Sequence, residues 1–174
     1  MKRPVNLVAS IGLVLGAVFG VAGTVVAQPN FRSTFWAIDA VGLVVATVLL
    51  AFKFFRAGND FVASGFLVFA IGEGVMLSGT AATLEASVPA FAAGTALWSA
   101  GLLLNSVPKV LAGWVRVVGV LAAILFATTS ATIFLGGRIL PTSSPLPFFA
   151  YPFLVLTFVG WIWTLLRQPE ISEK

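Results

Sequence analysis

The sequence predicts an all-α fold, an integral membrane bundle of six transmembrane helices with both termini in the cytoplasm. Only 9% of the 174 residues are charged, whereas soluble domains carry roughly 25%, and the mean hydropathy is +1.06. So few charges cannot cover a water-facing surface of this size. Six apolar runs, each long enough to cross a bilayer as a helix, form a single membrane domain over residues 1–174; they cover residues 5–27, 35–55, 61–79, 89–105, 115–135 and 148–166.

The first apolar run can be read in two ways. Basic residues precede it and small residues end it, as in a secretory signal peptide. It is, however, longer than the apolar region of most signal peptides, and Gly12, Gly16 and Gly20 recur in it at every fourth position. Small residues at this spacing form a helix face for close packing. We therefore expect residues 5–27 to remain as an uncleaved first helix.

The second and third runs each contain one acidic residue. Residues 28–34 are expected to form a loop, and the helix over 35–55 then places Asp39 a little over one turn from its beginning. The helix over 61–79 has Glu73 within an apolar run. Glycines recur in this helix at seven-residue spacing, which favours the close approach of a neighbouring helix; they are Gly65, Gly72 and Gly79.

The last three runs bring further polar and aromatic side chains into the membrane. The fourth begins with a proline, which suits the first turn of a helix. The fifth carries hydroxyl side chains toward its end, and the longest loop, rich in Pro and Gly, separates it from the sixth. The residues of these segments that are candidates for a site are Trp98, Thr128, Thr132, Arg138 and Tyr151.

The basic residues predict how the bundle is oriented. With the N-terminus in the cytoplasm, only Arg32 and Arg138 of the ten Lys and Arg residues lie outside. The other eight are Lys2, Arg3, Lys53, Arg56, Lys109, Arg116, Arg167 and Lys174. This distribution agrees with the positive-inside rule. We expect the chain in the cell membrane, which is the inner membrane if the source is a Gram-negative bacterium.

Glu73 is the residue around which we expect a functional site. An ionisable side chain within the membrane is costly and is by default a sign of function. In the predicted orientation Glu73 lies about 9 Å and Asp39 about 6 Å below the outer ends of their helices. The candidate ligand-binding residues form one layer in the outer half: Glu73, Asp39, Arg138, Thr128, Thr132, Trp98 and Tyr151. The alternative is that Glu73 is a structural carboxyl, either protonated or bonded to neighbouring hydroxyl groups.

The composition excludes several classes of site. The chain has no Cys and no His, which excludes disulfides, zinc sites of the Cys/His type and His-ligated haem. We expect no metal and no cofactor. The basic residues stand singly or in pairs at the ends of apolar runs, so we predict no nucleic-acid partner. The expected partners are membrane lipids, together with either a second copy of the chain or a membrane partner protein.

Three functions remain. The first, which we favour, is binding or transport of a small or lipid-like ligand in an outward-facing polar pocket around Glu73. The second is an accessory or scaffold subunit of a membrane complex, packed through Gly-rich helix faces. The third is an intramembrane enzyme that uses Glu73 and Asp39 as acid and base. A cavity beside Glu73 would favour the first, a lipid-exposed glycine face the second, and carboxyls facing each other across a gap the third.

Overall fold

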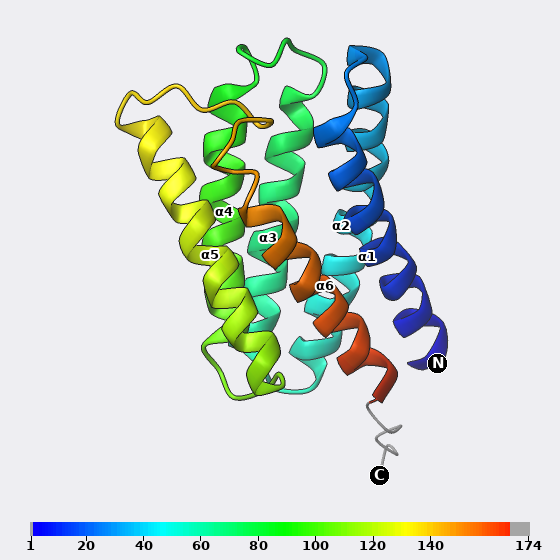
Figure 1. Ribbon diagram of the computed structural model, residues 1–174. Coiled ribbons are helices and arrows are strands. Elements are labelled where there is room, and N and C mark those ends of the chain that lie inside the picture. Colours follow the sequence, from blue (N-terminus) through cyan, green and yellow to red (C-terminus); the bar gives the residue numbers. More distant parts are fainter. Residues whose placement is uncertain (1, 168–174) are drawn as a thin grey trace.

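The structure, a computed structural model, describes residues 2–167 and contains six α-helices in this range (Figure 1). They are α1 (Lys2–Val25), α2 (Pro29–Arg56), α3 (Asp60–Gly79), α4 (Val88–Ser106), α5 (Gly113–Phe134) and α6 (Ala150–Arg167). Each is long and apolar enough to cross a membrane, so the predicted six-helix membrane fold is confirmed. The first and last helices begin and end at the same end of the bundle (Figure 1). Which side of the membrane this end faces stays a prediction, and Lys174, one of the residues behind that prediction, lies outside the described range.

The connection between α1 and α2 is shorter than the sequence suggested. The expected loop over 28–34 is helical from Pro29 onward, because proline at the first helical position lacks only an N–H that would be unpaired there anyway. The hydroxyls of Ser33 and Thr34 donate to the carbonyl of Asn30 at 3.0 and 2.9 Å. The Arg32 guanidinium donates to the Val26 carbonyl at 2.9 Å and so ties the start of α2 to the end of α1.

The helices form a ring. Within residues 2–167, each helix packs on the next one in the chain, and α6 packs back on α1 with the smallest contact of all. The α1–α6 seam is tied at the end where the chain begins: the Asn6 amide donates to the Leu165 carbonyl at 3.1 Å and accepts from the Lys53 ammonium group at 3.1 Å. Three helices, α1, α2 and α6, therefore meet at Asn6.

Aromatic side chains fill the half of the ring interior nearer to the termini. Phe54 stacks on Phe66, with ring centroids 5.5 Å apart, and Phe66 meets the edge of Trp161 at 4.7 Å. Further in, Phe69 stacks on Trp98 at 5.1 Å. Such pairs contribute about 0.5–1.5 kcal/mol each beyond the area they bury. This cluster closes one half of the ring and leaves the other half to a cavity.

Glycines set the distance between α3 and α4. A Cβ atom added at Gly72 would lie 3.0 Å from the carbonyl oxygen of Gly94, and one added at Gly94 would lie 3.0 Å from that of Gly72. Gly65 and Gly101, one heptad away on each helix, face each other in the same way at 2.8 and 2.7 Å. The seven-residue spacing therefore serves contact between these two antiparallel helices.

The glycine face of α1 lies against α2. A Cβ atom at Gly12 would overlap the Gly42 carbonyl, and one at Gly16 would overlap the side chain of Leu43. At Gly20 it would lie 2.9 Å from a carboxyl oxygen of Asp39. The face that the sequence marks for packing is thus used inside the chain, and its last member lies beside one of the two acidic candidates.

Candidate functional site

A cavity of about 80 Å³ lies inside the ring, in the half away from the termini. Its walls come from the end of α1, the beginning of α2, the end of α3 and parts of α4 and α6, with three residues of the connecting segments, Thr80, Ser87 and Pro141. This volume is enough for several water molecules but is well below the roughly 300 Å³ at which pockets for drug-sized ligands begin. The cavity suits a small polar group.

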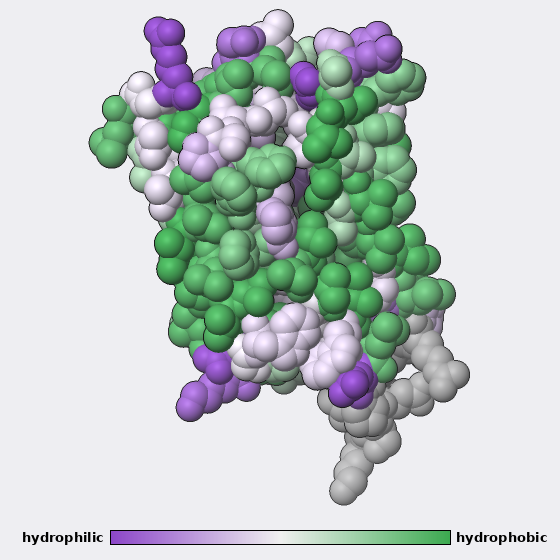
Figure 2. All heavy atoms as spheres, viewed as in Figure 1, coloured by the Kyte–Doolittle hydropathy of each residue, from purple (hydrophilic) through white to green (hydrophobic). Residues whose placement is uncertain are grey.

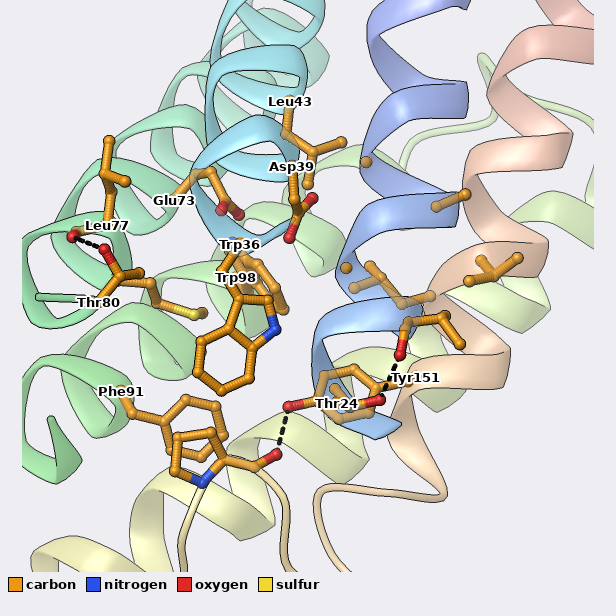
Figure 3. A pocket seen from close by; sticks show the side chains of 18 of the residues that line it. Thr24, Trp36, Asp39, Leu43, Glu73, Leu77, Thr80, Phe91, Trp98 and Tyr151 are labelled. Atoms are coloured by element: carbon orange, nitrogen blue, oxygen red, sulfur yellow. Dashed lines mark hydrogen bonds between the residues drawn. The ribbon is translucent and has the colours of Figure 1, made fainter. Parts of the chain in front are cut away.

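Two carboxyls meet in this cavity. Asp39 enters from α2 and Glu73 from α3, and Figure 3 shows their carboxyl groups pointing toward one another. Their side chains are only 7% and 3% exposed. One oxygen of each, Oδ1 of Asp39 and Oε2 of Glu73, has no hydrogen-bond partner among the described residues. Glu73 therefore lines a cavity instead of being sealed in helix packing.

Aromatic side chains from α2, α4 and α6 surround the carboxyls. The Trp98 indole lies close to the Glu73 carboxyl, and its N–H has no hydrogen-bond partner within the described part of the chain. The ring of Trp98 is fixed from behind by its stack on Phe69 and by the edge of Phe126 at 5.2 Å. Tyr151 donates its hydroxyl to the Pro141 carbonyl at 2.8 Å, which ties α6 to the preceding loop (Figure 3).

No basic side chain of the described residues lines the cavity. Arg138 is exposed in the loop before α6 and is not part of the wall. Arg32 is committed to carbonyl groups at the end of α1. Within residues 2–167 there is also no cluster of three acidic, His or Cys side chains that would hold a metal ion. Within the described part of the chain, the two carboxyls therefore have no basic side chain beside them in the cavity wall.

The cavity brings together four of the seven candidate residues, namely Glu73, Asp39, Trp98 and Tyr151. The other three do not line it. Thr128 and Thr132 lie on an exposed face of α5, where their hydroxyls donate to carbonyl groups one turn back in the same helix at 2.9 and 2.7 Å. Their neighbours Thr129 and Ser130 are the buried members of that hydroxyl cluster. A ligand-binding role for any of the seven residues stays a prediction.

Some lining residues did not figure among the candidates, although the sequence held a signal for them. Trp36 precedes Asp39 by three positions and therefore shares its helix face. Thr24 continues the four-residue series of small residues through Gly16 and Gly20, and all three line the cavity. In both cases the signal is the spacing, three or four positions, from another singled-out residue on the same helix.

The cavity approaches the surface between α1 and α6. Figure 1 shows α6 starting near mid-depth in the bundle, with the preceding loop above it. Figure 2 shows the surface hollowed there, beside α1 and above the beginning of α6. On the α1 side the wall includes Ala17 and Val21, and on the α6 side it includes Val155. The hollow therefore has apolar side chains on its α1 and α6 sides and faces the side of the bundle.

The carboxyl oxygens of Asp39 and Glu73 can accept hydrogen bonds from a small group that enters between α1 and α6, and as carboxylates they can pair with a cation. Comparisons with protein-family models, with curated proteins and with solved structures found no match to this chain.

Proposed function

We propose that this polytopic membrane protein binds a small organic cation of the ammonium class between Asp39 and Glu73. One observation carries the proposal: two buried carboxyls point at each other in a cavity whose described wall has no basic residue. An uncompensated buried charge costs several kcal/mol. A cation that enters the cavity supplies the missing partner to a carboxylate of this pair.

The aromatic walls support the same ligand class. Trp36, Trp98, Phe91 and Tyr151 contribute to the lining. A cation over such a ring gains about 0.5–2 kcal/mol, with Trp the strongest partner. The cavity of about 80 Å³ holds the ammonium head, while the apolar side chains of α1 and α6 in its wall accommodate an attached hydrocarbon. The ligand is therefore a small amine or the head of an amphiphilic amine.

Binding of methylammonium to the purified full chain in detergent tests the proposal, with Glu73→Gln and Glu85→Gln compared as a matched pair. Glu85 is exposed and is not a lining residue. Glu73→Gln removes the charge but keeps the shape, so we expect its affinity to fall by at least about tenfold, equivalent to about 1.4 kcal/mol. Glu85→Gln should bind like wild type. Equal binding by all three proteins, or preference for an anion such as acetate, would contradict the proposal.

The facing carboxyls also favour a second candidate, an intramembrane enzyme with an acid–base pair. A binding or transport protein returns its ligand unchanged, whereas an enzyme does not. Mass spectrometry of amines and amphiphiles recovered after incubation with the protein separates the two. The glycines that the sequence marks on α1 and α3 contact other helices of the same chain, so they give no support to the accessory-subunit alternative.

A further inference from the structure

We infer that a cation entering the cavity displaces a proton from the Asp39–Glu73 pair, so that the site exchanges one proton for one monovalent organic cation. The inference rests on the proposed function and adds to it a second, coupled ion. If the protein transports its ligand, a site of this kind would make it an exchanger, which moves a proton and an organic cation in opposite directions.

The first step of the inference concerns the charged and titratable side chains around the empty cavity. The ionisable side chains in its described wall are Asp39 on α2, Glu73 on α3 and Tyr151 on α6, while α1 and α4 contribute none. Lys53, also on α2, is bonded to Asn6 at the opposite end of the bundle. With no cation among the wall residues, the empty cavity is neutral only when both carboxyls hold a proton.

The second step concerns the free-energy cost of ionising one or both carboxyls in the empty cavity. Two carboxylates that share a site repel each other, so both do not ionise together. A single carboxylate buried without a partner pays the desolvation cost of a charge, which is several kcal/mol. The arrival of a cation removes this cost for one carboxylate. Ionisation of one carboxyl is therefore coupled to occupation of the cavity.

The step balances in atoms and charge. A carboxylic O–H bond breaks, its proton passes to water, and the resulting carboxylate pairs with the incoming ammonium ion. The other carboxyl keeps its proton and donates its O–H to that carboxylate. The site is neutral before and after, with one cation taken up and one proton released.

Glu73 is the group that gives up the proton. The indole N–H of Trp98 lies close to its carboxyl and has no partner among the described residues. A hydrogen bond donated to a carboxylate stabilises the charged form. Trp98 is thus a positioning residue that favours the ionised state of Glu73, and Asp39 is the carboxyl that remains protonated.

Calorimetric titration of the full chain with tetramethylammonium tests the exchange, because this ion carries a permanent charge and no exchangeable proton. Titrations at neutral pH in two buffers of different ionisation enthalpy give the number of protons released. We expect about one proton per bound ion, and an affinity that rises about tenfold per pH unit while the empty pair is protonated. Binding without proton release, or with an affinity independent of pH, overturns the exchange and leaves the proposed binding function standing. No binding of tetramethylammonium or methylammonium overturns both.

Infrared difference spectra provide a second, spectroscopic readout of the proton exchange, beginning with the wild-type protein. A protonated carboxyl shows a carbonyl band that a carboxylate lacks. Addition of tetramethylammonium should remove part of this band, and Glu73→Gln should abolish the change, whereas Glu85→Gln should not. An unchanged carbonyl band on ligand addition, in protein that binds the ion, contradicts the exchange.

Discussion

Glu73 and Asp39 can approach each other and the surrounding rings because small residues lie next to them. A Cβ atom at Gly20 would lie 2.9 Å from Oδ2 of Asp39, so any larger residue there would press on the carboxyl. A Cβ atom at Gly72 would lie 3.0 Å from Cδ1 of Trp98. The glycines thus place α1 beside one carboxyl and an indole beside the other.

Trp98→Phe separates the role of the indole N–H from the role of the ring. Phenylalanine keeps an aromatic surface on Phe69 but cannot donate to Glu73, and a hydrogen bond to a charged group contributes about 1.5–3 kcal/mol. We expect about a tenfold loss of tetramethylammonium affinity at neutral pH. The difference in affinity between wild type and Trp98→Phe should become smaller as the pH rises. At high pH Glu73 has already released its proton, so ligand binding no longer has to drive that step.

Trp161→Phe is the matched control for this experiment. Trp161 is also a buried indole whose N–H has no partner in the described part of the chain, but it does not line the cavity. Its replacement should leave affinity and its pH dependence unchanged. If Trp98→Phe bound the ion like wild type at every pH, the role assigned to the indole N–H would be wrong.

At the scale of the helix, the sequence predicts the number of spans and the depth of the acidic residues. It predicts less well which face of each helix is buried in the bundle. Apolar runs fix where a helix lies in the membrane, and counting from a helix end places Glu73 and Asp39 in one layer. Helix α5 is apolar almost all round, so nothing in its pattern indicates that Thr129 and Ser130 are buried while Thr128 and Thr132 are exposed. Ring closure depends on contacts between the two ends of the chain, which no local pattern encodes.

Gly101→Ala and Gly74→Ala test the packing of α3 on α4. A methyl group at Gly101 would lie 2.7 Å from the backbone carbonyl oxygen of Gly65. Because a Cβ atom is fixed to its own backbone, the two atoms cannot move apart without separating the helices. We expect this variant to unfold at a lower temperature, with a loss of about 1–3 kcal/mol, as in other overpacked sites. Gly74 has open space around it, so Gly74→Ala should be neutral or gain up to about 1 kcal/mol from higher helix propensity. Thermal unfolding in detergent measures both, and equal melting temperatures would contradict the packing argument.

At the scale of the whole molecule, the ring is closed at one end and hollow at the other. Asn6 joins α1, α2 and α6 near the termini, and the aromatic cluster fills the interior beside it. The cavity occupies the other half, where α6 has given way to a loop (Figure 1). Among the described residues, the cavity beside Glu73 lies in one half of the bundle, so the exchanger that we propose would have to open the aromatic half during its cycle.

The last prediction is that the cavity end of the bundle faces the outside of the cell. Glu85 lies in the connection between α3 and α4, at the cavity end, and Lys109 lies between α4 and α5, at the opposite end; both are exposed. Because the chain has no Cys, Glu85→Cys and Lys109→Cys each introduce a single reactive thiol. The positive-inside rule places Lys109 in the cytoplasm, so an impermeant thiol reagent added to intact cells should label Glu85→Cys and leave Lys109→Cys unlabelled until the membrane is permeabilised. Labelling of both from the same side would contradict the six-span arrangement. Labelling of Lys109→Cys alone would keep the fold but reverse the orientation, so that the cavity would open toward the cytoplasm.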